Sequence, residues 1–179
     1  MKFLPAPLAG ALLIEPEPMS DDRGFFARLY DSAEFAARGL ETSWPHVSIS
    51  FNRRAGTLRG LHWQQAPFEE TKLVRCTRGA IHDVILDLRR DSPTFGRWHA
   101  EELSADNHRM LYVPRGLAHG FQSLGDNCEV AYHLSAPYRP DAARGVRWND
   151  PRFGIRWPLE VTAISDADRS MPDFRDLPP

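Results

Sequence analysis

Short apolar runs separated by glycine, proline and polar turn residues dominate the chain, whereas helical periodicity is scarce. Runs of this kind, recurring roughly every 8–12 residues, are typical of an all-β sandwich or barrel. One short helix is predicted over 32–38, with Asp31 or Ser32 as its N-cap. The predicted strands occupy residues 71–74, 81–88, 98–103, 109–113, 121–124 and 129–134.

Two strand positions leave alternatives open. Asp83 interrupts an apolar run, so it either faces solvent or is buried and paired with a donor such as Lys72 or a histidine. Tyr132 lies on the opposite face from Ala131. It points into the barrel lumen or serves as a core tyrosine with a satisfied hydroxyl, which is the commoner role.

The turns and the tail complete the expected outline. Gly125-Asp126-Asn127 predicts a hairpin before the last strand. After Pro140 the chain becomes irregular and rich in aromatic residues, and we expect that tail to pack across the barrel.

The composition fits one domain, predicted to span 1–179. The chain has 179 residues, of which 42% are apolar, so it can bury a sizeable core. Its net charge is -2, and no region is basic enough to predict nucleic-acid binding. Cys76 and Cys128 lie in apolar runs outside any C-x-x-C motif, which predicts buried free thiols.

The N-terminal segment does not resemble a targeting sequence. Pro5 and Pro7 interrupt it, so it lacks the continuous apolar region of a signal peptide. No stretch of the sequence approaches the ~20 apolar residues of a membrane helix. We expect a cytoplasmic protein without a membrane partner.

The segment 56–64 carries the strongest chemical signal. Arg59 stands three positions before His62, and Lys72 follows ten positions after it. A cation for an anionic group, an imidazole for a proton and a lysine for a developing negative charge are the parts needed for proton abstraction beside a carbonyl.

A second signal is the segment 114–121, in which a Pro-x-Gly-x-x-His turn delivers His119 to a strand. A core histidine bonded within the turn and a functional histidine fit these residues about equally. The pattern resembles the second motif of cupin barrels, where this histidine is a metal ligand. Because Trp63 and Gln64 follow His62, the second histidine of such a site is absent, and no metal is predicted.

Two further segments are ambiguous by themselves. In the segment 22–26, Arg23 beside a glycine and two phenylalanines suits a phosphate or planar-ring contact. On these residues alone an ordinary turn with two core phenylalanines is favoured. Near the C-terminus, Asp166 and Asp168 suggest a solvated tail unless one of them reaches back to a histidine.

Taken together, these pieces resemble the dTDP-4-dehydrorhamnose 3,5-epimerases over about the whole chain. The family fold is a cupin-type jelly-roll β-barrel, here expected with short peripheral helices. The resemblance also implies a homodimer and no metal or organic cofactor. It rests on residues 22–25, 56–64, 72–75, 83–89, 103–107, 113–121, 132, 138, 144–148 and 164–168.

The activity that the resemblance implies is epimerisation at C3 and/or C5 of a nucleotide-diphosphate-linked 4-keto-6-deoxyhexose. His62 resembles the base that removes the proton beside the C4 ketone, and Asp168 its carboxylate partner. Tyr132 resembles the acid that returns a proton from the opposite face. Lys72 is expected to stabilise the C4 oxyanion.

The resemblance also implies substrate contacts. Arg59 and Arg23 resemble diphosphate or nucleotide contacts, and Tyr138 the ring that stacks on the base. His119 and Asp83 are expected near the C4 oxygen.

The nucleotide contacts depart from the family pattern. Arg28 stands where the family commonly has glutamate, and Ser48 and Ile49 lie where the thymidine enzymes tend to show Gln-Asp-Asn. A carboxylate accepts a hydrogen bond from thymine N3–H, whereas a guanidinium only donates. Arg28 therefore suits a base without N3–H, such as cytosine, unless it points to solvent.

The sequence is also compatible with other functions. A single-site epimerase acting at C3 or C5 of a CDP-linked or other sugar, and a 3,4-ketoisomerase, are the alternatives among isomerases. A non-catalytic sugar-nucleotide-binding cupin and a metal-dependent cupin oxygenase are the alternatives from other classes.

Overall fold

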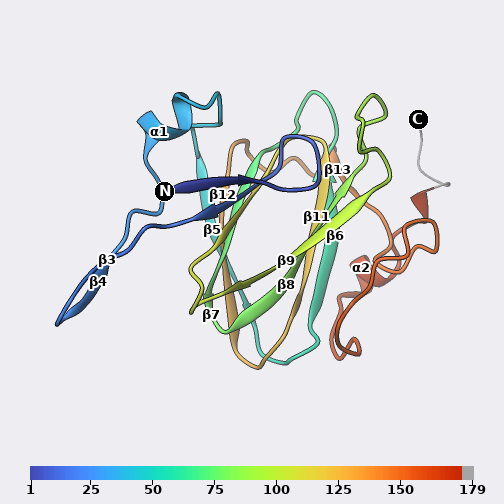
Figure 1. Cartoon of the computed structure of the whole chain (residues 1–179). Coiled ribbons are helices and arrows are strands. Elements are labelled where there is room, and N and C mark those ends of the chain that lie inside the picture. The colour runs from blue at the N-terminus through green and yellow to red at the C-terminus, as the bar shows by residue number, and fades with distance from the viewer. Residues whose placement is uncertain (175–179) are drawn as a thin grey trace.

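The computed structural model describes residues 1–174, which form a barrel of two antiparallel sheets (Figure 1). The first sheet has the order β1 (Lys2–Pro5), β2 (Leu12–Glu15), β10 (Met110–Val113), β7 (Lys72–Arg78), β12 (Cys128–Leu134), β5 (His46–Asn52). The second has the order β13 (Ala143–Gly145), β6 (Leu58–Gln64), β11 (Leu117–Ser123), β8 (Ala80–Asp87), β9 (Trp98–Ser104). The predicted all-β, cupin-type jelly-roll barrel with short peripheral helices is confirmed.

Apolar side chains fill the barrel between the sheets and also cover the outer face of each sheet. The interior cluster includes Val74, Ile85 and Val130. A second cluster, with Val84 and Leu86, lies on the other face of β8. Strand β8 therefore reads as a nearly continuous apolar run because both of its faces are buried.

The predicted elements mostly lie where the pattern placed them. Helix α1 (Ser32–Ala36) is shorter than predicted, and Asp31 is its N-cap, accepting from Ala33 N at 2.9 Å. Strand β11 begins at Leu117, earlier than predicted, because the chain becomes extended directly after the Pro114 turn. Strands β1, β2, β5, β6 and β13 were not predicted.

Several other expectations can be compared with the structure. Cys76 and Cys128 are buried and free, as predicted. Contrary to the interpretation favoured on its residues alone, the turn at 22–26, with its two phenylalanines, is not part of the core. It forms the hairpin of β3 (Met19–Asp21) and β4 (Gly24–Phe26), which projects from the barrel and leaves Phe25 and Phe26 exposed by 53% and 63% (Figure 1).

The tail beyond Pro140 packs across the five-stranded sheet, as expected. Helix α2 (Asp166–Arg169) lies against β6, within a segment that we call the C-terminal strap (165–174). Gly145 on β13 lies next to this strap, where a Cβ atom would meet only the flexible Met171 side chain. Within residues 1–174, none of the helices combines the length and apolar character needed to cross a membrane.

Candidate active site

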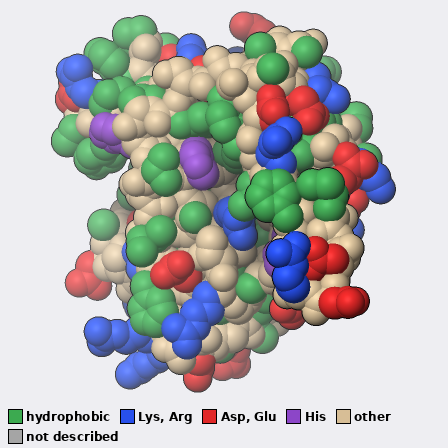
Figure 2. Space-filling model, turned by 90° about the vertical axis from the view of Figure 1, so that its left-hand side faces the viewer, with side chains coloured by type: hydrophobic (Ala, Val, Ile, Leu, Met, Phe, Trp, Pro, Cys, Tyr) green, Lys and Arg blue, Asp and Glu red, His purple; other side chains and the backbone are tan. Residues whose placement is uncertain are grey.

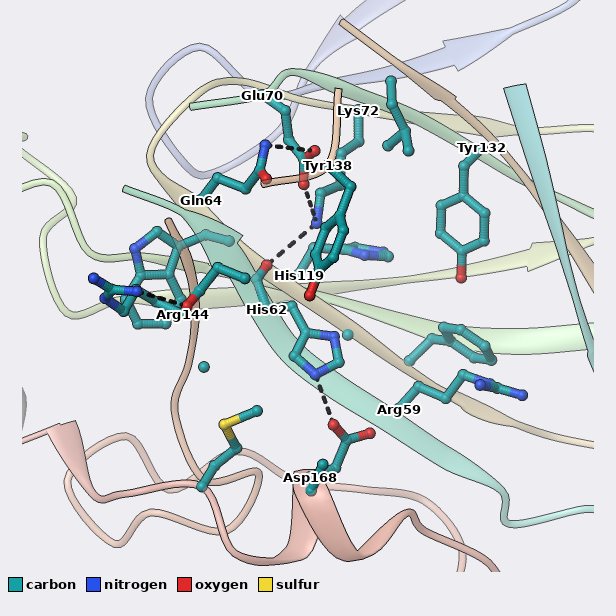
Figure 3. Close-up of a pocket in the computed structure, with 18 of the residues that line it drawn as sticks. Arg59, His62, Gln64, Glu70, Lys72, His119, Tyr132, Tyr138, Arg144 and Asp168 are labelled. Atoms are coloured by element: carbon teal, nitrogen blue, oxygen red, sulfur yellow. Dashed lines mark hydrogen bonds and ion pairs between the residues drawn. The ribbon is translucent and has the colours of Figure 1, made fainter. Parts of the chain in front are cut away.

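One cavity of about 700 Å³ opens between the two sheets. It brings together most of the residues predicted from the sequence, although they come from five strands, a loop and the C-terminal strap (Figure 3). The predicted residues that line the cavity are Ser48, Arg59, His62, Lys72, His119, Tyr132, Tyr138 and Asp168.

At the floor of this cavity, His62 is paired with the C-terminal strap. Its Nε2 lies 2.6 Å from Asp168 Oδ1, and Asp168 Oδ2 accepts from Gly60 N at 3.2 Å. Burial alone would raise the pKa of Asp168, but the contacts with His62, Gly60 and Ser165 outweigh it and lower that pKa. The ionised carboxylate therefore holds the proton on Nε2 and leaves Nδ1 free to accept another.

A glycine makes this arrangement possible. Gly60 has a φ of +107°, and a Cβ atom there would lie 2.6 Å from Gly120 Cα and 2.8 Å from His119 O. Only glycine allows β6 to approach β11 so closely. The same backbone places the Gly60 N–H within reach of Asp168.

Across the cavity, Tyr132 enters from β12 on the opposite sheet (Figure 3). Its ring meets the His119 ring edge to face, with centroids 6.1 Å apart. Burial and the charge of Asp83 raise the pKa of Tyr132 well above its usual value, whereas Arg59 and Ser50 act in the opposite direction. Tyr132 is therefore protonated at neutral pH and can donate a proton.

Asp83 is buried and paired, which was one of the two alternatives left by the sequence. It is fully buried, and its Oδ1 lies 2.8 Å from His119 Nε2. Asp83 thus supports His119 from behind and is not among the residues that line the cavity.

Lys72 has a partner that the sequence analysis missed. Its Nζ lies 3.2 Å from Glu70 Oε1 and donates to the backbone oxygen of His62 at 3.2 Å. Both side chains are about nine-tenths buried, at 9% and 10% exposure. The sequence signal that could have found Glu70 is its spacing from Lys72, because residues two apart on an extended chain share a face.

Polar groups around the mouth of the cavity suit an anionic ligand. Arg59 Nε donates to Asn52 Oδ1 at 2.8 Å, which fixes the guanidinium at the wall. Arg144 on β13 also lines the cavity and was missed as a site residue. Gln64 Oε1 accepts from Arg139 N at 2.6 Å, which ties the exposed loop carrying Tyr138 to β6.

Besides Asp83, three predicted substrate contacts lie outside the cavity of their own chain. Arg23 sits on the projecting hairpin, is 89% exposed and pairs with Asp21 at 2.6 Å. Arg28 is 60% exposed and pairs with Asp31 at 3.2 Å. Ile49 is 67% exposed, because alternation along β5 turns it away from the face that carries Ser48.

The described residues 1–174 contain no group of three or more His, Cys, Asp or Glu side chains arranged to hold a metal ion. The chemistry that these residues can perform by themselves is proton transfer, with a base and an acid on different sheets and a buried cation beside them.

Comparison with known proteins identifies the family. The family model described as dTDP-4-dehydrorhamnose 3,5-epimerase matches residues 5–176. A curated relative of that name from Methanothermobacter thermautotrophicus is 42% identical, covering 99% of this chain and 96% of its own. A structure of a Bacillus anthracis enzyme of that name, with TDP and PPi bound, is 44% identical with a TM-score of 0.92, covering 96% and 98%.

A related activity occurs on the same fold. The structure of a 3'-monoepimerase from Streptomyces bikiniensis, in complex with dTDP-quinovose, is 34% identical with a TM-score of 0.88, covering 95% of this chain and 86% of its own. The match to the family model, and the sequence identity to a named member over nearly the whole chain, establish the family. The chain is an isomerase that belongs to the dTDP-4-dehydrorhamnose 3,5-epimerase family.

Proposed function

We propose that His62 and Tyr132 are the base and the acid with which this epimerase inverts carbons beside the C4 ketone of a dTDP-linked 4-keto-6-deoxyhexose. The observation that carries the proposal is the pairing of His62 with an ionised Asp168, across one cavity from a protonated Tyr132. A single domain supplies every residue of this set.

The first half of the reaction is proton removal. The C4 ketone acidifies C3 and C5, because either carbanion delocalises onto the carbonyl oxygen. Nδ1 of His62 takes the proton, the C–H electron pair moves to form the enolate, and Asp168 stabilises the resulting imidazolium. The Lys72 ammonium stabilises the negative charge on the C4 oxygen.

The second half is proton return from the other side. Tyr132 donates its hydroxyl proton to the carbon, and the electron pair returns from the enolate as the ketone reforms. Solvent then reprotonates the tyrosinate and removes the proton from His62, whose side chain is 44% exposed. Both enzyme groups return to their starting states, so no co-reactant is consumed.

Substitution of the acid and of the base should have different effects on proton exchange. In D₂O, Tyr132→Phe should still exchange the substrate proton through His62 but should not invert the carbon. His62→Asn should do neither, with exchange reduced by about 10²-fold or more. Proton NMR at C3 and C5 measures both reactions.

The same spectra separate the family activity from the monoepimerase alternative. Wild-type enzyme should incorporate deuterium at both C3 and C5. Exchange at C3 alone would establish the single-site activity found in the Streptomyces bikiniensis relative. Inversion by Tyr132→Phe at the wild-type rate would contradict the role given to Tyr132.

The nucleotide we propose is dTDP. The Bacillus anthracis relative binds TDP, and Tyr138 at the mouth of the cavity offers a ring on which a base can stack. Arg28, which suggested cytosine, pairs with Asp31 and lies outside the cavity of its own chain.

Calorimetric titration tests this choice of base. We expect dTDP to bind at least ~tenfold more tightly than CDP, a difference of about 1.4 kcal/mol. Arg28→Ala should leave that ratio unchanged. Equal or tighter binding of CDP would overturn the proposal and favour Arg28 as the group that selects cytosine.

We further propose a cytoplasmic homodimer formed through the outer face of β5. Val47, Ile49 and Phe51 are exposed by 62%, 67% and 43% on this edge strand. Hydrophobic side chains are also visible on the face from which the β3–β4 hairpin projects (Figure 2). Contiguous exposed apolar surface of this kind marks protein interfaces.

A second copy would also explain the position of Arg23. This side chain lies outside the cavity of its own chain, so a nucleotide contact by Arg23 requires the cavity of the partner.

Ile49→Glu should convert the dimer to a monomer in sedimentation velocity, because a buried unpaired carboxylate opposes association. Leu159→Glu is the control, since Leu159 is an exposed apolar residue elsewhere, at 40%. A dimer in both variants, or a monomeric wild type, would contradict an interface on β5.

A further inference from the structure

Glu70 is fixed beside Lys72 by the backbone that joins them. It lies two residues before Lys72, the first residue of β7, and its side chain is on the same side of the chain as that of Lys72. Between them, Thr71 N donates to Ser135 Oγ at 2.8 Å, and Ser135 N donates to Thr71 O at 3.1 Å. These two hydrogen bonds connect the start of β7 to the end of β12. They hold in place the backbone that carries both side chains.

Each carboxylate oxygen of Glu70 has its own partner (Figure 3). Oε1 lies 3.2 Å from Lys72 Nζ, and Oε2 accepts from Gln64 Nε2 at 3.3 Å. Gln64 is itself only 2% exposed, and its amide also donates to Phe68 O at 3.0 Å. The orientation of the Glu70 carboxylate is therefore set from both sides.

The contacts of Lys72 leave one of its N–H donors available to a ligand. An ammonium carries three N–H donors. One of them faces Glu70 Oε1 and another donates to His62 O. Because Lys72 lines the cavity, the remaining donor is available to a ligand there.

We propose that Glu70 is a positioning residue for the epimerase reaction, holding the Lys72 ammonium as its buried counter-ion and aiming its remaining N–H at the C4 oxygen. This inference rests on the proposed function, in which Lys72 stabilises the enolate. Glu70 itself acts only through Lys72.

The physical reason is the cost of a buried charge. An ammonium that is nine-tenths buried needs a paired anion, and without one the neutral amine is favoured. A neutral amine cannot offer the enolate a positive charge. Loss of Glu70 should therefore weaken catalysis most on the alkaline side, where the amine loses its proton first.

Other charged and titratable groups face the same cavity. They are Arg59 and His62 on β6, His119 on β11, Tyr132 on β12, Arg144 on β13, Tyr138 in the loop after β12 and Asp168 in the C-terminal strap. None of them changes in a Glu70 variant, so a comparison with wild type isolates the effect of Glu70.

The test is the pH dependence of deuterium exchange into the substrate. Glu70→Gln keeps the size and one acceptor oxygen but removes the charge. We expect its exchange rate to stay within a fewfold of wild type at pH ~6.5 and to fall ~tenfold or more below wild type at pH ~9. Binding of dTDP should be unchanged in calorimetry.

Two matched variants accompany it. Glu69→Gln makes the same change one residue earlier, outside the cavity, and should retain the wild-type profile. Glu70→Asp keeps the charge and should recover most of the alkaline activity. This variant also tests the proposal if Glu70→Gln does not fold.

A uniform loss of activity at all pH values would overturn the proposal, because it indicates a purely structural role. A wild-type profile in Glu70→Gln, or an alkaline loss in Glu70→Asp as large as that in Glu70→Gln, would overturn it as well. Failure of the underlying function is distinguishable, since wild-type enzyme would then show no exchange at any pH.

Discussion

The hydrogen bond between His62 and Asp168 is the interaction on which the rest of the site depends. It joins residues 106 positions apart and places the C-terminal strap across β6. The strap is anchored at its far end by Arg147, which pairs with Asp173 at 2.7 Å, and by Asp150, whose Oδ2 accepts from Phe174 N at 2.6 Å. The tail of the chain therefore completes the proton-abstracting group.

The same principle recurs around the cavity. Asp168 lies beside His62, Asp83 behind His119, and Glu70 beside Lys72. The pairs at His119 and Lys72 are buried, and buried charges are costly unless each is paired and hydrogen-bonded. A barrel with a packed apolar interior can therefore hold a polar site only where carboxylates accompany the imidazoles and the ammonium.

These pairs also give the groups different protonation states. Asp168 has a lowered pKa and is ionised, whereas Tyr132, partly buried on the opposite sheet near Asp83, has a raised pKa and keeps its proton. An acceptor and a donor of protons therefore face one cavity at the same pH. Their separation on two sheets provides the two-sided access that inversion at carbon requires.

Much of this could be predicted from the sequence, because the informative signals were local. Alternation placed Tyr132 on the opposite face from Ala131, and the spacing of Arg59, His62 and Lys72 indicated the proton chemistry. The family resemblance supplied the partnership of His62 with Asp168, which no local pattern decided.

The remainder depended on facts that only the three-dimensional structure contains. Ser48 and Ile49 are adjacent in sequence, and only the pleat of β5 decides which of them faces the cavity. No local pattern singled out Glu70, which the fold buries against Lys72. By composition, Phe25 and its neighbour resemble core residues. Only the structure shows that their hairpin projects from the barrel and leaves them exposed.

Solvent exchange with Asp168→Asn is the direct test of whether Asp168 makes His62 an effective base. Asp166→Asn, an exposed neighbour on α2, is the matched control. Asp168→Asn should slow deuterium incorporation beside the C4 ketone by about 10²-fold or more, with dTDP binding unchanged and the control near wild type. Exchange by Asp168→Asn at the wild-type rate would contradict this role of Asp168.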